Sequence, residues 1–584
     1  MDKHFTKERN VQIVLSLLKA HGIRKVIASP GTTNIAVVGS MQNDPYFEIY
    51  SSADERSAAY MACGLAAESG EPVVLSCTGA TASRNYMPGL TEAYYRKLPV
   101  IALTSSQPIG RSGHLYPQFV DRTEQPKDIV CCSVQIPYVM NQEDEWNCIV
   151  KANQALLELK RHGGGPIHLN LIVGGEYTDF STKELPATRI IKRISYADKF
   201  PDLPAGKIAI FIGSHSPFNK KLTRIIDMFC AANDAVVFCD HTSGYKGEYR
   251  VLYPLVASQQ IEDANFKMDL LIHIGEISGD YLTTAKMRFA KNVWRISEDG
   301  EIRDYFHKLT YVFEMKEEDF FAHYTDTDIT KNEYLKACRD KIQEISANIP
   351  ELPFSNIWIA SQIAPQLPGG SVLHLGILNS LRAWNYFEIP YSVASFCNVG
   401  GFGIDGGVSS LIGASLSNPS KIYFGIFGDL AFFYDMNVLG NRHVGRNVRI
   451  LLVNNGKGTE FRNYNHPGAT FGDEADKFIA AAGHYGNKSH TLVRHYAEDL
   501  GYEYLSASNK EEFNAVYQRF VTSELTERSM VFEVFTTNED ESSALKLLNS
   551  IKTDSMVQIK SVIKKSVSNM LGRDKVQGIK LLLK

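Results

Sequence analysis

Residues 422–461 read IYFGIFGDLAFFYDMNVLGNRHVGRNVRILLVNNGKGTEF and predict a strand, a helix and a second strand. The apolar run IYFGIF ends at Asp429, a helix follows through Phe432–Asn441, and the run VRILLV ends next to Asn455. Two parallel strands of one βαβ unit would bring Asp429 and Asn455 to the same carboxyl edge of a sheet, where open α/β sheets bind ligands. A carboxylate and an amide oxygen suit Mg²⁺, which prefers hard oxygens and keeps phosphate and water among its ligands.

The same residues also fit an ordinary buried βαβ unit, in which the aspartate caps the helix and Asn-Asn forms a turn. However, Gly-Asp followed some two dozen residues later by Asn-Asn resembles the thiamine-diphosphate (ThDP) signature of the decarboxylase and carboligase superfamily. The resemblance implies a metal site made by the Asp429 carboxylate, the Asn455 amide oxygen and the Lys457 carbonyl. The implied cofactors are ThDP and Mg²⁺.

The turn after the first strand narrows the resemblance to one branch. The third residue of the signature is commonly glycine, and here it is Leu430. Gly-Asp-Leu followed by YDMN at 434–437 resembles the MenD-type enzymes, the SEPHCHC synthases of menaquinone biosynthesis. The turn that the resemblance implies for cofactor binding comprises Gly428, Asp429, Leu430 and Ala431.

The composition is that of an ordinary protein of several domains. At 584 residues, the chain has room for roughly three to four domains of about 150 residues each. It contains 44% hydrophobic and 22% charged residues, and its net charge of −4 argues against nucleic-acid binding. Nine scattered cysteines without a CxxC pair favour neither a disulfide framework nor a zinc site. The N-terminus MDKHFTKERN is not a signal peptide, and no run of 18 apolar residues occurs, so we expect a cytoplasmic protein.

Strands and helices alternate along most of the chain, which predicts α/β domains with doubly wound parallel sheets. Two polar, proline-containing stretches, 181–206 and SANIPELPF, read as linkers and divide the pattern into three domains. The resemblance identifies them as pyrimidine-binding (PYR), central and diphosphate-binding (PP) domains. Their expected ranges are 1–180, 207–345 and 355–540, followed by a basic amphipathic tail at 541–584.

Glu55 is the expected catalytic residue. It lies in SSADERSAAYMACGLAAESG, where Ser52-x-x-Glu55 fits a helix capping box, which is a purely structural role. The segment also resembles the acidic helix of the ThDP family, whose glutamate hydrogen-bonds N1′ of the cofactor's aminopyrimidine. The resemblance implies that Glu55, held away from bulk water, shares a proton with that ring and promotes formation of the cofactor's carbon nucleophile.

Other candidates resemble further family segments. The small-residue turn CTGATASRNY, residues 77–86, resembles a segment near the cofactor and supplies Thr81 and Asn85. Gln118, in HLYPQF, resembles an active-site glutamine of the MenD-type enzymes.

Two segments that precede residue 422 complete the predicted site. Asn379, Ser380 and Arg382 follow a strand and resemble the MenD-type motif NSMPIRD. Residues 397–407, CNVGGFGIDGG, resemble the family's NRGASGIDG. This implies that Ile404 props the cofactor into its bent shape and that the Phe402 carbonyl accepts a hydrogen bond from the 4′-amino group. A glycine-rich turn with a core isoleucine is the structural alternative.

Three departures from the MenD-type pattern bear on the substrate. SPGSR becomes SPGTT at 29–33, DRP becomes SQP at 106–108, and NRGAS begins as NVG at 398–400, so three arginines that could grip carboxylates are absent. We therefore expect ThDP- and Mg²⁺-dependent decarboxylation of a 2-oxo acid and transfer of the acyl unit to an acceptor other than isochorismate, such as a keto sugar or an aldehyde. The substrate-binding candidates are Thr32, Thr33, Gln118 and Arg382.

Three alternatives remain open. They are a true SEPHCHC synthase with a rearranged pocket, a simple 2-oxo acid decarboxylase, and a ThDP-binding sensor or scaffold, against which the presence of Glu55 argues. The resemblance also implies a homodimer or homotetramer. The apolar stripe of the tail, with lysines opposite, fits packing on the oligomer or weak contact with a membrane surface.

Overall fold

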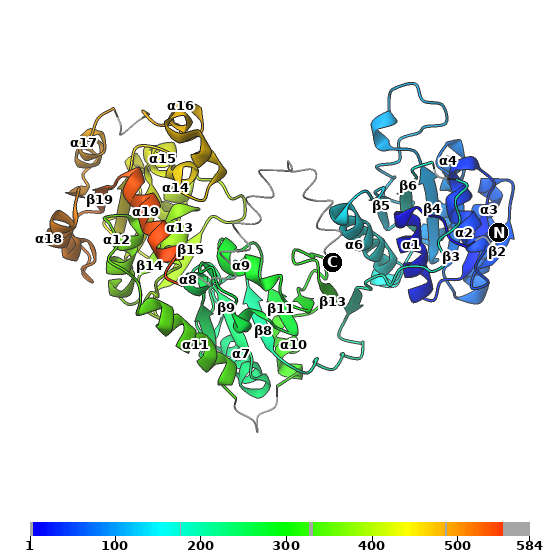
Figure 1. Ribbon diagram of the computed structural model, residues 1–584, viewed down its shortest axis with the longest axis horizontal. Coiled ribbons are helices and arrows are strands. Elements are labelled where there is room, and N and C mark those ends of the chain that lie inside the picture. Colours follow the sequence, from blue (N-terminus) through cyan, green and yellow to red (C-terminus); the bar gives the residue numbers. More distant parts are fainter. Residues whose placement is uncertain (1–3, 176, 326–330, 485–487, 553–584) are drawn as a thin grey trace. The chain divides into compact units, whose positions relative to one another are not determined.

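The fold is described from a computed structural model, which places residues 4–175, 177–325, 331–484 and 488–552 (Figure 1). The described residues form two compact units. Unit 1 comprises those up to Phe200 together with Asp299–Glu314, and unit 2 comprises Pro201–Glu298 and the residues from Met315 onward. All strand pairs in the sheets are parallel, so the predicted fold class is confirmed. The predicted tail lies outside the described residues from position 553 onward.

Unit 1 is built on a six-stranded sheet with the order β2-β1-β3-β4-β6-β5. Its strands are β1 (Lys25–Ala28), β2 (Glu48–Ser51), β3 (Val73–Thr78), β4 (Val100–Ser106), β5 (Cys132–Ile136) and β6 (Ile167–Ile172). Its α-helices are α1 (Arg9–Ala20), α2 (Ile35–Gln42), α3 (Glu55–Ser69), α4 (Thr81–Asn85), α5 (Met87–Tyr95) and α6 (Gln142–Glu158). The 3₁₀ turns are η1 (Thr32–Asn34), η2 (Ile109–Arg111) and η3 (Arg161–Gly163).

Each face of this sheet carries its own hydrophobic core. On one face, residues of α1, α2 and α6 pack on Val26 and Val74, and on the other face residues of α3 to α5 pack on Ile27 and Leu75. Neighbouring strand residues point to opposite faces, which is why strands covered by helices on both sides are apolar throughout.

The segment 299–314 belongs to unit 1 although unit 2 flanks it on both sides. It contains β13 (Leu309–Phe313), which pairs with β7 (Lys192–Ile194), a strand inside the stretch expected to be a linker. Two ion pairs tie the segment further: Arg189 contacts Asp304 at 2.6 Å, and Arg161 contacts Glu301 at 2.9 Å.

Unit 2 contains two sheets. In the first, β10-β9-β8-β11-β12 are neighbours in this order. The strands are β8 (Ile208–Ile212), β9 (Val236–Cys239), β10 (Arg250–Leu252), β11 (Leu270–Ile274) and β12 (Asn292–Ile296). The helices are α7 (Lys220–Asn233), α8 (Pro254–Ala257), η4 (Ala264–Phe266), α9 (Tyr281–Met287), α10 (Glu317–His323) and α11 (Glu333–Ser346).

The second sheet of unit 2 has the order β15-β14-β16-β17-β19-β18. Its strands are β14 (Val372–Leu375), β15 (Ala394–Cys397), β16 (Tyr423–Gly428), β17 (Val448–Asn454), β18 (Glu503–Ala507) and β19 (Met530–Phe535). The α-helices are α12 (Asn356–Ile363), α13 (Asn379–Trp384), α14 (Gly407–Ser415), α15 (Asp429–Asp435), α16 (Ala475–Phe478), α17 (Leu492–Asp499), α18 (Lys510–Phe520) and α19 (Asn538–Asn549). The 3₁₀ segments are η5 (Ala364–Gln366), η6 (Met436–Gly440), η7 (Thr459–Arg462) and η8 (Pro467–Glu474).

The strand order reverses next to the first strand of each six-stranded sheet. In unit 1 the reversal lies between β1 and β3, and in unit 2 it lies between β14 and β16. Ligands of doubly wound sheets bind at such points, outside the carboxyl ends of the strands. Both carboxyl edges therefore carry the candidate site residues that are described next.

Three predicted elements differ in detail. The helix expected at Phe432–Asn441 begins at Asp429 and becomes a 3₁₀ segment at Met436. The small-residue turn expected over 77–86 contains the helix α4, which meets α5 at the fully buried Tyr86. The tail expected to begin at 541 starts inside α19, whose Leu545 and Leu548 are buried.

Candidate active site

Asp429 and Asn455 follow two adjacent parallel strands of unit 2, as predicted. β16 and β17 are in register from Tyr423↔Val448 to Gly428↔Val453, so both strands end at the same edge. The Gly456 N–H donates to Asp429 Oδ2 at 2.6 Å and ties the two strand ends together. Gly428 occupies the N-cap position of α15 and Asp429 is the first helical residue, which removes the explanation of the aspartate as the helix cap.

The Asp429 carboxylate is suited to a cation. It is 4% exposed, and burial raises its pKa to about 6. Its oxygens accept hydrogen bonds from the backbone N–H groups of Leu430 and Gly456, and it forms no ion pair within the described part of the chain. A buried carboxylate without a counter-charge is costly, and an adjacent divalent cation would offset that cost.

The other two predicted metal ligands meet around Thr459, a residue that the sequence analysis missed. Thr459 Oγ1 donates to Asn455 Oδ1 at 2.5 Å, and the Thr459 N–H donates to the Lys457 carbonyl at 2.9 Å. Each acceptor oxygen has a second lone pair that could face a metal. The described residues contain no group of three or more His, Cys, Asp or Glu able to hold a metal by itself. A metal at this edge would therefore need phosphate and water to complete its shell, as the cofactor diphosphate provides.

The backbone beside the reversal of the unit 2 sheet is strained. Leu378 (φ +68°) and Phe402 (φ +57°) adopt positive φ, which costs a non-glycine residue about 1–3 kcal/mol and is concentrated at binding sites. Leu378 directly precedes Asn379 and Ser380, the start of α13, and Phe402 precedes the half-buried Ile404. The predicted cofactor residues thus lie in or next to strained turns. No sequence signal indicated the strain at Leu378.

Arg382 is paired within its own chain. Its Nη2 lies 2.8 Å from Glu460 Oε1 and its Nη1 lies 3.0 Å from Glu460 Oε2, while Nη1 also donates to Asn379 Oδ1 at 3.1 Å. Both side chains are largely buried, with 16% and 19% exposure. In NSMPIRD the arginine is the fourth residue after the serine, and here that position is the fully buried Trp384, so Arg382 lies two residues earlier.

In unit 1, Glu55 is not part of a capping box. The N-cap of α3 is Asp54, whose carboxylate accepts hydrogen bonds from the N–H groups of Arg56 and Ser57, whereas Ser52 Oγ donates to the Asp54 carbonyl. The structural alternative for Glu55 is therefore wrong. Instead, Asn85 Nδ2 donates to Glu55 Oε2 at 3.2 Å, which brings together the predicted catalytic residue and a predicted cofactor residue.

The threonines predicted in unit 1 lie at the reversal between β1 and β3. Thr33 Oγ1 is 2.6 Å from Thr78 Oγ1 at the end of β3, and Thr32 and Thr33 form η1. A Cβ at Gly31 would lie 2.8 Å from the Thr78 Cβ, so only glycine allows this approach. Thr81 begins α4 just beyond the same strand.

Gln118 is a further predicted residue of unit 1. It is exposed, adopts φ +57°, and belongs to the segment between η2 and β5. Within the described residues its side chain forms no hydrogen bond, so the structure offers no contact that supports its predicted role.

Comparisons with known proteins place this geometry in a family. Residues 9–125 match the family model described as thiamine pyrophosphate enzyme, N-terminal TPP binding domain. The chain is 30% identical over 562 residues to the 2-succinyl-5-enolpyruvyl-6-hydroxy-3-cyclohexene-1-carboxylate synthase (SEPHCHC synthase) of Phocaeicola vulgatus, which covers 93% of this chain and 98% of that protein. This chain belongs to the MenD-type family of ThDP-dependent enzymes.

Two further relatives carry the same name. A MenD-type enzyme of Bacteroides thetaiotaomicron is 30% identical over 564 residues, and one of Bacteroides fragilis is 29% identical over 562 residues, each covering 93% of this chain and 98% of the relative. The predicted family membership, enzyme class and ThDP dependence are thereby confirmed. None of the helices among the described residues is both long and apolar enough to cross a membrane.

Proposed function

We propose that this MenD-type enzyme uses ThDP and Mg²⁺ to decarboxylate a 2-oxo acid and transfers the acyl unit to an acceptor with less negative charge than isochorismate, such as a keto sugar or an aldehyde. The observation that carries the acceptor class is the bidentate pairing of Arg382 with Glu460. An arginine held by a carboxylate of its own chain does not offer its full charge to a substrate carboxylate. The three absent arginines point the same way.

The residues present fit the cofactor. Bound ThDP would supply the electron sink for loss of CO₂ from a 2-oxo acid. In this proposal Asp429, Asn455 and the Lys457 carbonyl hold Mg²⁺ beside the diphosphate. Glu55 binds the pyrimidine end: Asn85 donates to Oε2, so that Oε1, which forms no hydrogen bond within the described chain, can hold or release a proton.

A second candidate is SEPHCHC synthesis itself. Identity to enzymes of that name extends over 93% of the chain and favours it. The two candidates differ in the acceptor, so one set of assays separates them.

The test starts from protein loaded with ThDP and Mg²⁺. CO₂ release is followed with pyruvate, 2-oxobutyrate, 2-oxoglutarate and phenylpyruvate, each with and without glycolaldehyde or a keto sugar, and 2-oxoglutarate is also tested with isochorismate. We expect ThDP-dependent CO₂ release from at least one 2-oxo acid and no productive reaction with isochorismate.

Efficient SEPHCHC formation would show that the interpretation of the lost arginines is wrong. If ThDP binds but no 2-oxo acid is decarboxylated, the protein is a cofactor-binding sensor or scaffold. Glu55→Gln is the matched control, because CO₂ release that survives in this variant does not come from the proposed site.

A further inference from the structure

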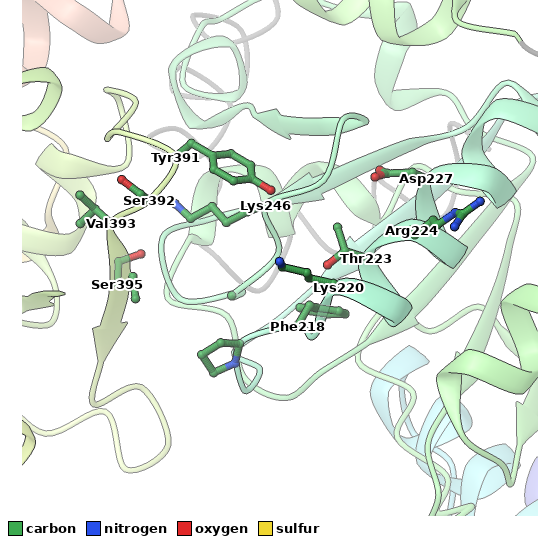
Figure 2. A pocket seen from close by; sticks show the side chains of 13 residues that line it. Phe218, Lys220, Thr223, Arg224, Asp227, Lys246, Tyr391, Ser392, Val393 and Ser395 are labelled. Carbon is green, nitrogen blue, oxygen red and sulfur yellow. The ribbon is translucent and has the colours of Figure 1, made fainter. Parts of the chain in front are cut away.

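A cavity of about 480 Å³ lies between the two sheets of unit 2 (Figure 2). One wall is the segment around the start of α7 and the loop after β9, and the other is residues 391–395, which lead into and begin β15. Its volume is in the range of small-molecule sites. None of its lining residues belongs to the candidate active site.

The two walls are held together by buried hydrogen bonds. The His241 N–H donates to Asn385 Oδ1 at 3.0 Å, His241 Nε2 lies 3.0 Å from the Trp384 carbonyl, and Ser395 Oγ donates to the His241 carbonyl. His241 is 1% and Ser395 is 7% exposed. Buried hydrogen bonds within unit 2 thus hold the two walls of the cavity in place.

Three cations line the cavity: Lys220, Arg224 and Lys246. Within the described part of the chain, none of their side chains forms a hydrogen bond or ion pair. The one carboxylate in the lining, Asp227, is engaged by the Tyr245 hydroxyl and the Glu248 N–H. The lining therefore carries an excess of positive charge.

Lys246 forms no ion pair within the described part of the chain, and the charges that act on it, Arg250 and Glu388, lie outside the lining. Figure 2 shows its side chain extending towards Ser392, whereas Arg224 lies at the opposite end of the cavity near Asp227. Burial lowers the pKa of Lys246 to about 8, because the ammonium is removed from water, and the positive charge of Arg250 lowers it further. By contrast, Lys221 on the adjacent position of α7 lies outside the lining and pairs with Glu318 at 2.6 Å.

The rest of the lining is partly apolar. Pro217, Phe218, Tyr391 and Val393 contribute to the walls, and the Tyr391 ring reaches over the cavity (Figure 2). The start of α7 adds the positive end of a helix dipole. We propose that this cavity binds a small organic phosphate with a planar or apolar body, its phosphate held by Lys220 and Lys246. The proposal does not rest on the proposed reaction.

The test uses full-length protein saturated with ThDP and Mg²⁺, so that the cofactor's own diphosphate site is filled. Calorimetry measures binding of phenyl phosphate, of inorganic phosphate and of phenol. We expect saturable binding of phenyl phosphate, weaker binding of phosphate, and none of phenol. Lys246→Met should weaken phenyl phosphate at least about tenfold, as expected for loss of one charged hydrogen-bonding partner.

Lys221→Met is the matched control, because it removes one lysine charge outside the cavity, from the same helix that carries Lys220, and should leave the Kd unchanged. Lys220→Met is a second variant in case Lys246→Met does not fold. The proposal is overturned if the wild type shows no saturable binding of phenyl phosphate. It is also overturned if the cavity variants and Lys221→Met bind it equally.

Discussion

Glu55 does not have the helix-capping role that the surrounding sequence predicted. Asp54 caps α3, and Glu55 contacts Asn85. Glu55→Gln should therefore fold normally and bind ThDP, but turnover should fall by about 10²–10⁴-fold, because an amide cannot exchange a proton with the cofactor ring. Steady-state assays and calorimetry with ThDP measure the two effects separately.

Glu68→Gln is the control for this prediction, since Glu68 is an exposed residue of the same helix. It should leave turnover unchanged. If Glu55→Gln exchanged the cofactor C2 proton at nearly the wild-type rate, Glu55 would not be the group that activates ThDP.

Asp429→Ala should abolish Mg²⁺-dependent ThDP binding. The carboxylate is buried at the strand edge, and without it the metal would lose its one charged protein ligand in the proposed set. Calorimetry with ThDP, with and without Mg²⁺, measures the effect. An unchanged affinity in the presence of Mg²⁺ would remove Asp429 from the metal site.

Asp280 gives a pH-dependent prediction. Burial, together with nearby Asp240, raises its pKa to about 7, well above the unfolded value near 4. The folded protein therefore holds this proton more tightly, and the stability that it contributes is lost as the pH rises through about 7. Asp280→Asn keeps the cap on the Leu282 and Thr283 N–H groups but removes the charge.

Relative to wild type, this variant should gain stability as the pH rises from 4 to 8, by up to a few kcal/mol, since one pH unit corresponds to about 1.4 kcal/mol. Denaturant unfolding at both pH values measures the gain. Asp54→Asn is the control, because this exposed cap has its pKa lowered by the Ser57 hydrogen bond and should show no such gain. A pH-independent difference for Asp280→Asn would contradict the prediction.

At this scale, local patterns predicted some contacts and not others. Asp429 and Asn455 could be placed together because each ends a strand of one βαβ unit, and strand ends of parallel neighbours share an edge. The Arg382–Glu460 pair joins residues far apart in sequence, and no periodicity indicates it. The sequence indicated Ser52 as the cap of α3, whereas the cap is Asp54. The difference was missed because serine and aspartate both fit a cap position.

At the scale of single elements, α19 gives a prediction about the C-terminus. Gln259 Nε2 donates to the Leu548 carbonyl at 2.9 Å, and Leu545 and Leu548 are buried. Truncation after Glu541 should lower the Tm strongly, because burial of each leucine contributes about 1.5–3 kcal/mol. Truncation after Lys552 keeps α19 whole and should leave the Tm and solution activity unchanged, which thermal unfolding and steady-state assays measure.

The two truncations are each other's control. If both kept the wild-type Tm, α19 would contribute little to unit 2. If both lowered it, residues beyond 552 would take part in the fold or assembly, and the interpretation of the tail as a weak membrane contact would lose its support.

Buried strands were the elements best predicted from sequence. IYFGIF and VRILLV became β16 and β17 within about a residue, because helices on both faces require continuous apolar runs. Helix ends were predicted less well, since Gly428 and Tyr86 shape the chain through local turns and tertiary burial rather than through periodicity. The short β7 was missed because its partner is β13, more than a hundred residues away.

At the scale of the whole molecule, the proposed site divides between the units. Glu55 lies in unit 1 and Asp429 in unit 2. The resemblance to the ThDP family implies that one cofactor contacts such domains from different subunits, which stays a prediction for this chain. We expect at least a dimer by light scattering. An equal mixture of inactive Glu55→Gln and Asp429→Ala subunits should recover up to about a quarter of wild-type turnover, because half of randomly paired dimers hold one intact site.

The control for this experiment is each variant mixed with itself, which should stay inactive. No recovery after verified subunit exchange, or a monomer that turns over, would contradict the shared site.

Part of unit 1 lies within the sequence of unit 2, so a cut of the chain after Phe200 separates unit 1 from one of its own segments. A polypeptide ending at Phe200 lacks β13, the partner of β7, and also lacks Asp304 and Glu301, the partners of Arg189 and Arg161. Those groups remain on the other fragment, within 299–314. To complete unit 1, the larger of two co-produced fragments would have to donate β13 to the smaller one. The two fragments would then behave as a split protein, whose reassembly shows that they have met.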